Sequence, residues 1–173
     1  MKDLRERVLV GLLVGMFLAG AAAAASQAAT VLADVKSQGA RAVASRLWSD
    51  STQWNQIMTN IGHGSREWLQ VAAALRPGTD AGASEALDEA MFLALKAAPV
   101  PVLQLLKDGT FETNTVCSSN IGIDYTPAQS RRFIKDRIKA LETLSDTGTL
   151  ATREQCLAGL RAALAEIDRS KAK

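Results

Sequence analysis

Apolar residues recur at helical spacing along most of the chain, and the elements that they predict are helices. Trp54, Ile57, Met58 and Ile61 fall on one face at a period of 3.6 residues. β-Branched residues form no alternating runs of the kind that strands show, and alanine and leucine are abundant. We therefore expect an all-α fold, a compact irregular bundle of six to seven short-to-medium helices. These span roughly residues 29–48, 52–61, 65–75, 84–97, 99–106, 127–144 and 152–169.

Several helix ends carry signals in the sequence. Thr126, Pro127 and Gln129 have the order of a capping box with proline at the first helical position. Thr152 and Gln155 have the spacing of a second capping box, which predicts the start of the last helix there. The glycine at position 39 weakens the middle of the first predicted helix, although the pattern continues through it.

The first 25 residues have the order of a secretory signal. Lys2, Arg5 and Arg7 give a positive start, residues 8–20 form an unbroken apolar run, and residues 21–25 are all alanine. This order predicts a signal peptide over residues 1–25, cleaved after the last of these alanines or a few residues later. The alternative is an uncleaved anchor, because the apolar run and the alanines together approach the roughly 20 residues of a spanning helix.

Cleavage would leave roughly 150 residues, the size of one domain. We expect residues 26–50 to form a leader or first helix that is partly mobile, residues 51–169 a helical domain, and residues 170–173 a frayed tail. The whole chain has a formal net charge of +2, from 20 basic and 18 acidic residues. Nucleic-acid binding requires clustered positive charge, so we expect no nucleic-acid partner. We also expect no membrane span once the signal is removed.

The two cysteines, Cys117 and Cys156, are predicted to form a disulfide. An exported chain enters an oxidising compartment, where an even pair of cysteines is typically bridged. Closing a loop of about 40 residues would stabilise the fold by about 4 kcal/mol in the chain-entropy account. Two buried free thiols are the alternative. Neither cysteine has a second ligand at the spacing of a zinc site, so we expect no metal.

Candidate binding residues lie in three parts of the sequence. A histidine between two glycines is expected to be exposed, which suits recognition or proton transfer. Three tryptophans at positions 48, 54 and 68 would either line an apolar ligand pocket or pack in the core. Residues 110–125 form the least helical stretch, which the disulfide would pin as a binding loop. The candidate binding residues are His63, Trp54, Trp68, Phe111 and Tyr125.

Two groups of charges each have two interpretations. Asp80, Glu85, Asp88 and Glu89 would offer a cation site, or would simply suit the start of a helix, where the dipole favours acidic groups. The helix after Pro127 carries a basic surface that would meet an acidic partner or anionic lipid, or would only be a solvated face. The basic residues are Arg131, Arg132, Lys135, Arg137 and Lys139.

The stretch from Trp54 to Leu103 carries a series of short motifs. They are Ile61-Gly62, Trp68-Leu69, the run from Leu75 to Ala81, Glu85-Ala86-Leu87, Ala94-Leu95 and Pro101-Val102-Leu103. Together with the two later cysteines, these motifs resemble a group of small exported helical proteins of proteobacteria, an uncharacterised family. The resemblance implies export and a helical fold, and it implies no activity and no functional residue.

We predict a periplasmic interaction module that is not an enzyme, uses no cofactor and binds another protein of the envelope. The prediction rests on export, on a small stabilised helical scaffold with a pinned loop, and on a sequence without a recognisable catalytic set. An inhibitor- or immunity-like role would suit the size and the compartment. The alternative function is a small-ligand or lipid carrier with a tryptophan-lined pocket, and the alternative location is the inner membrane through an uncleaved N-terminal segment. The sequence leaves the oligomeric state open.

Denaturing mass spectrometry of the exported protein, with and without reductant, tests both covalent predictions. We expect the mass of a chain that begins at Ser26 or a few residues later and that gains two hydrogens on reduction. A mass that includes residues 1–25 would support the anchored alternative. A mass unchanged by reductant would contradict the disulfide.

Overall fold

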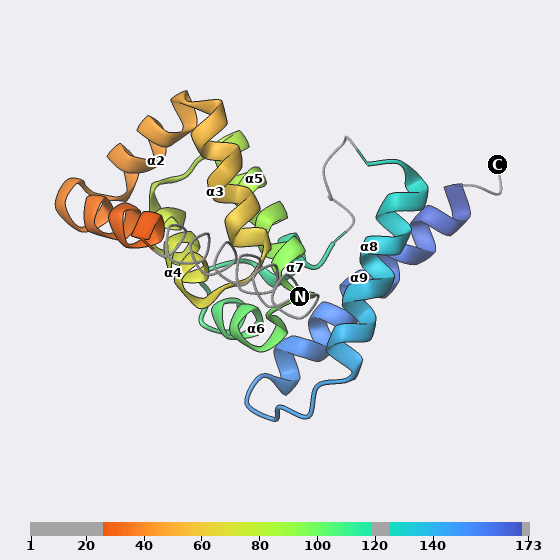
Figure 1. Ribbon diagram of the computed structural model, residues 1–173. Coiled ribbons are helices and arrows are strands. Elements are labelled where there is room, and N and C mark those ends of the chain that lie inside the picture. The colour runs from red at the N-terminus through yellow and green to blue at the C-terminus, as the bar shows by residue number, and fades with distance from the viewer. Residues whose placement is uncertain (1–25, 119–124, 171–173) are drawn as a thin grey trace, which may run out of the picture.

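The structure, a computed structural model, describes residues 26–118 and 125–170. Within these ranges the chain forms nine α-helices and one 3₁₀-helix, with no strand (Figure 1). The first helix covers residues 26–38. The other elements are α2 (Ala40–Ser49), α3 (Ser51–Gly62), α4 (Arg66–Leu75), the 3₁₀-helix η1 (Arg76–Gly78), α5 (Ala81–Ala94), α6 (Pro99–Lys107), α7 (Thr113–Val116), α8 (Pro127–Glu142) and α9 (Leu150–Ser170).

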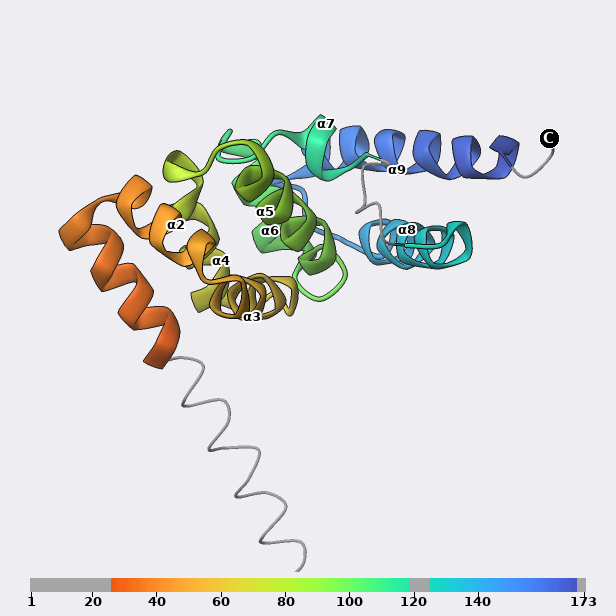
Figure 2. The ribbon, with the colours of Figure 1, turned by 90° about the horizontal axis from the view of Figure 1, so that it is seen from above.

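The helices form a body and an arm. The body contains residues 26–118, from the first helix to α7. The arm is the antiparallel pair α8 and α9, which lie side by side and extend away from α2, α3 and α4 (Figures 1 and 2). Helix α9 also packs against α6 and α7, so the base of the arm is joined to the body. The outer end of the arm, where α8 begins and α9 ends, projects (Figure 2).

One hydrophobic core runs from the first helix into the arm. Helix α5 is central to it, because α5 packs against α3 and α7 and buries half of its residues, among them Leu87 and Met91. In the arm, Ile134, Leu141 and Leu160 are completely buried. Burying one such side chain stabilises a fold by about 1.5–3 kcal/mol, so the arm is a packed part of the molecule.

The all-α fold is confirmed, and the number of helices is higher than expected for two local reasons. Gly39 has φ +86°, a left-handed conformation that other residues rarely adopt. It divides the helix predicted over 29–48 into residues 26–38 and α2. Residues 110–125, expected to be irregular, contain the single-turn helix α7. The helices gather closely in the body, whereas the arm extends from it (Figure 2).

One predicted capping box is present and the other is wrong. The Thr126 hydroxyl accepts a hydrogen bond from Gln129 N, and the Gln129 side chain accepts one from Thr126 N. Helix α9, however, begins at Leu150, before the predicted box at Thr152 and Gln155. The turn before α9 is instead held by Asp146, whose Oδ2 accepts hydrogen bonds from Thr149 N and Thr149 Oγ1 at 2.9 and 2.6 Å.

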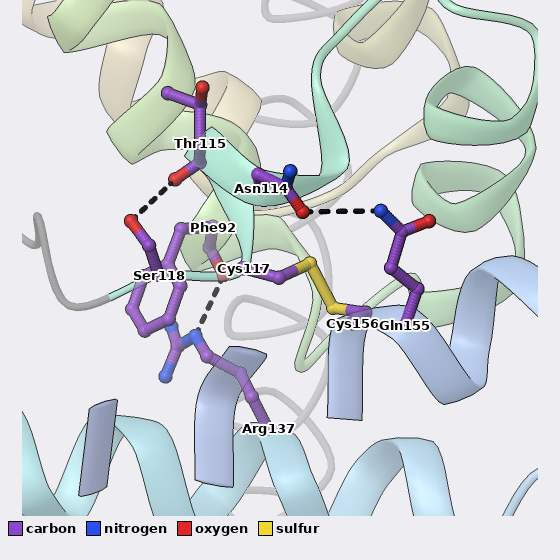
Figure 3. Close-up of a disulfide and its surroundings, with 8 residues drawn as sticks. All are labelled: Phe92, Asn114, Thr115, Cys117, Ser118, Arg137, Gln155 and Cys156. Carbon is purple, nitrogen blue, oxygen red and sulfur yellow. Dashed lines mark hydrogen bonds between the residues drawn. A yellow bond between two sulfur atoms is a disulfide. The ribbon is translucent and has the colours of Figure 1, made fainter. Parts of the chain in front are cut away.

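The predicted disulfide is confirmed. Cys117, directly after α7, is bonded to Cys156 in the first half of α9, and both residues are buried (Figure 3). Beside the bridge, Gln155 Nε2 donates a hydrogen bond to Asn114 Oδ1 at 3.1 Å. The bridge therefore fastens the last helix of the body to the base of the arm.

A glycine inside α9 allows this close contact. A Cβ atom added to Gly159 would lie 2.4 Å from the carbonyl oxygen of Cys117. Glycine inside a helix costs about 1 kcal/mol relative to alanine, so its position here is explained by the approach of the α7 backbone rather than by helix formation.

The predicted domain boundaries fall partly outside the described residues. The predicted signal peptide, residues 1–25, and positions 171–173 of the predicted tail lie outside them. Residues 26–50, expected to include a mobile leader, are mostly helical, and Val31, Val43 and Leu47 belong to the core. Among the helices of residues 26–118 and 125–170, none is long and apolar enough to cross a membrane.

The Gly159→Ala variant tests the close approach of α7 and α9. The added methyl group has no space against the Cys117 carbonyl, so we expect the free energy of unfolding to fall by about 1–3 kcal/mol. Urea denaturation monitored by circular dichroism measures the change. Gly148→Ala is the control, because its added Cβ would meet only Asp146 at 3.6 Å. Equal stability of Gly159→Ala and wild type would contradict the tight contact.

Candidate functional site

The structure does not gather the five candidate binding residues into one site. Trp54 of α3 and Trp68 of α4 are both 3% exposed, and Phe111 is 1% exposed. His63 is exposed at the turn after α3, and Tyr125 is half-buried just before α8. The aromatic rings that Trp54 and Tyr125 contact do not belong to the five candidates. Trp54 packs edge-on against Trp48 at 5.3 Å, and Tyr125 packs edge-on against Phe133 at 5.0 Å.

The buried tryptophans act as core residues. Trp54 and Trp68 belong to the hydrophobic core, and the indole Nε1 of each is buried without a hydrogen-bond partner among the described residues. An unsatisfied buried donor costs about 1–3 kcal/mol, which the large apolar area of an indole offsets. These two side chains are therefore not available at the surface.

The exposed aromatic residue of this cluster is Trp48, which is not among the five candidates. Trp48 is 48% exposed, and its ring lies against Gly82 at the start of α5, where an added Cβ would be 3.3 Å away. The sequence placed Trp48 in the tryptophan cluster, but helical periodicity alone does not separate an outward ring from two inward ones.

A shallow groove of about 240 Å³ lies between α4 and α6. Its lining is apolar at Leu69, Pro101 and Leu105 and polar at Arg66 and Gln104. No tryptophan lines this groove. Small-molecule pockets usually measure roughly 300–1,000 Å³, so this groove is small for a ligand site.

Within the acidic group considered as a cation site, Asp88 of α5 forms an interior ion pair. Asp88 is 8% exposed, and Arg76 Nη1 lies 3.1 Å from its Oδ1. Burial raises the pKa of Asp88, and the charge of Arg76 opposes that increase. The Arg76 guanidinium also lies 5.1 Å from the centre of the Phe111 ring. Both Asp88 and Phe111 therefore contact Arg76 of η1 inside the body.

Metal ligation finds no support in the described ranges. Residues 26–118 and 125–170 contain no group of three or more histidine, cysteine, aspartate or glutamate side chains that would hold a metal ion. Asp80 and Glu85 are exposed, whereas Asp88 is occupied by Arg76. The cation site considered for this acidic group thus lacks the converging carboxylates that it would need.

Arg137 of α8 makes the most extensive polar contact between arm and body (Figure 3). It is 3% exposed, and its guanidinium stacks on the Phe92 ring at 4.2 Å. Nε donates to the Phe92 carbonyl at 2.7 Å, Nη2 to the Leu93 carbonyl at 3.1 Å, and Nη1 to the Phe133 carbonyl at 2.9 Å. Burial lowers the pKa of Arg137 to about 10, which leaves the side chain charged at neutral pH.

This cation lies at the negative end of α5. Phe92 and Leu93 are in the last turn of that helix, where carbonyl groups lose their regular amide partners and the helix dipole favours positive charge. The Phe92 carbonyl also accepts a hydrogen bond from Leu95 N at 3.3 Å. Arg137 therefore serves as a C-terminal cap for α5 supplied by another helix. In the sequence, Arg137 was predicted to lie on a basic surface, because a buried arginine with carbonyl partners has no distinct sequence signal.

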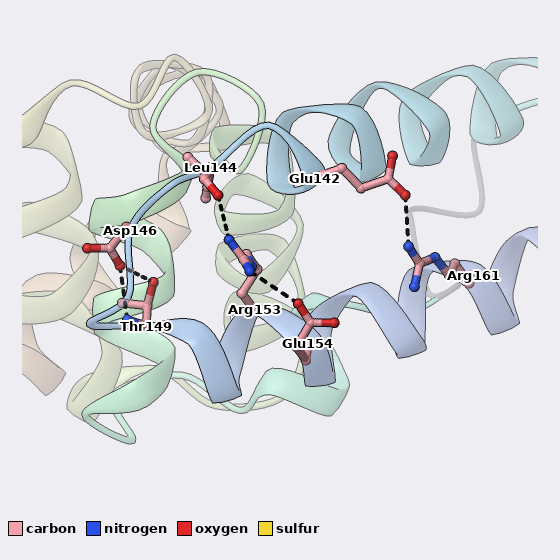
Figure 4. A network of polar contacts seen from close by, with 7 residues as sticks. All are labelled: Glu142, Leu144, Asp146, Thr149, Arg153, Glu154 and Arg161. Carbon is pink, nitrogen blue, oxygen red and sulfur yellow. Dashed lines mark hydrogen bonds and ion pairs between the residues drawn. The ribbon is translucent and has the colours of Figure 1, made fainter.

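Polar contacts also hold α8 to α9 at the base of the arm (Figure 4). Arg153 Nη1 donates to the Leu144 carbonyl at 2.6 Å, and Arg161 pairs with Glu142 at 2.8 Å. At the outer end, Arg131 pairs with Asp168. The arm is thus joined along its length, and α8 keeps a defined outward face.

The remaining basic residues of α8 form that outward face. Arg132, Lys135 and Lys139 are all exposed, and at spacings of three and four residues they lie along one side of the helix. We call these three residues the basic stripe. It is the one group of candidate residues that the structure places together, accessible to solvent and on a fixed element.

Comparison of the chain with protein families, curated proteins and solved structures finds no match. The resemblance to small exported proteobacterial proteins therefore stays a prediction.

The Arg137→Met variant tests how strongly this contact holds the arm. Methionine fills part of the space but leaves the Leu93 carbonyl without its donor and the Phe92 carbonyl with only Leu95 N at 3.3 Å, so we expect about 3 kcal/mol less unfolding free energy. Arg137→Lys should recover only part of the loss, because an ammonium group cannot reproduce the forked contacts.

The control for this comparison is Lys135→Met, an exposed change two residues away that should alter stability by less than about 0.5 kcal/mol. Urea denaturation at neutral pH measures all three variants. Equal stability of Arg137→Met and Lys135→Met would show that the buried contact contributes nothing.

Proposed function

We propose that this chain is an exported, non-enzymatic interaction module whose arm binds another protein through the outward face of α8. The main observation that supports this proposal is that the projecting arm, α8 and α9, is attached to the body by several independent contacts. They are the Cys117–Cys156 bridge, the carbonyl contacts of Arg137, the Lys96–Asp136 ion pair at 2.7 Å and the hydrogen bond from Lys107 Nζ to the Gly148 carbonyl at 2.9 Å.

An arm attached to the body in this way is suited to binding a partner protein rather than to serving as a flexible linker. A surface that is already held in its bound orientation loses less conformational entropy on binding, and this raises affinity without adding contacts. Helix α8 has 16 residues and is therefore about 24 Å long. A helix of that length presents four turns to a partner, enough to dock in a groove or beside another helix.

The carrier function receives less support from the geometry. A carrier would need an apolar pocket large enough for its ligand, whereas the groove between α4 and α6 measures about 240 Å³ and contains no tryptophan. Trp54 and Trp68, which would have lined such a pocket, are core residues. Protein binding therefore remains the better-supported function.

Site-specific photo-crosslinking in cells that produce the protein tests the proposal. A photoreactive amino acid replaces Ala128, which is exposed on α8 one turn before Arg132. We expect a discrete crosslinked product that mass spectrometry assigns to one envelope protein, and a purified complex of the two proteins at micromolar concentrations or below.

The control position is Ala42, which is exposed on α2 in the body. It should give no such product, because α2 lies away from the arm (Figure 1). Equal crosslinking from both positions would indicate nonspecific proximity. Absence of a protein product from the arm, or turnover of a cell-wall substrate by the purified chain, would overturn the proposed function.

A further inference from the structure

The basic stripe carries positive charges that form no ion pair within the described residues. Of the five basic residues on α8, Arg131 pairs with Asp168 and Arg137 is buried against α5. Arg132, Lys135 and Lys139 form no ion pair with any described residue. Like charges four residues apart on a helix are destabilising by about 0.2–0.5 kcal/mol, so Lys135 and Lys139 slightly oppose folding of α8.

The two carboxylates of α8 itself form ion pairs with residues of other helices. Asp136 is within helical reach of Arg132 and Lys139, but its Oδ2 lies 2.7 Å from Lys96 Nζ at the end of α5. Hydrogen bonding to Lys96 lowers the pKa of Asp136, so this carboxylate remains ionised and engaged at neutral pH. Glu142 is three residues after Lys139, but it pairs with Arg161 of α9.

The stripe faces away from the body. At 100° per residue, its three positions lie roughly 160–220° around α8 from Arg137, the residue that points into the body. Because Arg137 fixes the rotation of α8, the three cations are held on the solvent side. A partner can therefore reach all of them at once, along about 10 Å of helix.

A lipid surface fits this geometry less well than a protein does. Membrane-binding helices insert large apolar side chains beside their basic residues, whereas the exposed large apolar residues of the described ranges are Trp48 and Leu150, neither of which is on α8. Each lysine or arginine adds only about 1 kcal/mol at an anionic membrane, so three give weak attachment. Carboxylates spaced along a partner helix would instead match the stripe residue by residue.

We infer that the basic stripe of Arg132, Lys135 and Lys139 is the docking surface for an acidic helix of the partner protein. This inference rests on the proposed function and specifies the partner's chemistry. The complementary segment carries aspartate or glutamate at the same spacings of three and four residues. Charge complementarity of this kind accelerates association, and weakens as ionic strength rises.

Titration of the purified full chain with two synthetic helical peptides tests the inference. One peptide carries glutamate at three positions with the spacing of the stripe, and the other carries glutamine at those positions. We expect the wild type to bind the glutamate peptide at least tenfold more tightly at low ionic strength. Lys135→Glu/Lys139→Glu should abolish this preference, whereas Lys36→Glu/Arg41→Glu, with the same change in net charge on an exposed part of the body, should retain it.

Three outcomes would overturn the inference. The first is equal affinity of the wild type for both peptides, and the second is an equal loss of preference for the glutamate peptide in the two double variants. The third is that the wild type sediments with phosphatidylglycerol vesicles and only Lys135→Glu/Lys139→Glu fails to do so. The last outcome would identify a membrane surface as the target. Photo-crosslinking from Ala128 distinguishes failure of this inference from failure of the proposed function. If Lys135→Glu/Lys139→Glu still gives the crosslinked protein product, the chain binds a protein but not through the basic stripe.

Discussion

The orientation of the arm depends on one buried cation. Arg137 reaches from α8 to the last turn of α5 and donates to two carbonyl groups there. Taking a charge out of water costs several kcal/mol, and here the hydrogen bonds, the helix dipole and the Phe92 ring offset that cost. Because the partners are backbone atoms, the contact specifies position: α8 can rotate or slide only by breaking it. The outward face of α8 follows from this inward contact.

A second contact between a helix and the backbone of another segment lies at the disulfide. Cys117 and Cys156 bring α7 against α9, and Gly159 leaves space for the Cys117 carbonyl one turn further along. The covalent bond and the missing side chain are needed together, since a bulkier residue would push the two backbones apart. Helix α9 thereby belongs to both parts of the molecule, packed on the body at its start and on α8 beyond.

Local sequence signals predicted the parts of this fold that depend on neighbouring residues. The Thr126 capping box and the disulfide are examples, because each is set by residue type and spacing. Features that depend on distant contacts were missed, as at Arg137, which resembles its exposed neighbours in sequence although it is buried. The helix break at Gly39 has a local cause, its φ of +86°, which apolar periodicity does not reveal. The candidate site shows the same division. The basic surface was recognised from the sequence, but only the fold separates its three exposed members without an ion pair from Arg131 and Arg137, which are engaged.

The position of the bridge has a further consequence for the integrity of the chain. Cys117 lies before α8 and Cys156 lies after it, so the disulfide closes a covalent ring that contains the whole of α8. A protease that cuts the backbone once anywhere within this ring leaves the two pieces linked through sulfur. Release of α8 as a fragment would require two cuts, or one cut and a reductant. In a compartment that contains proteases, the helix that carries the basic stripe is thus retained by topology as well as by packing.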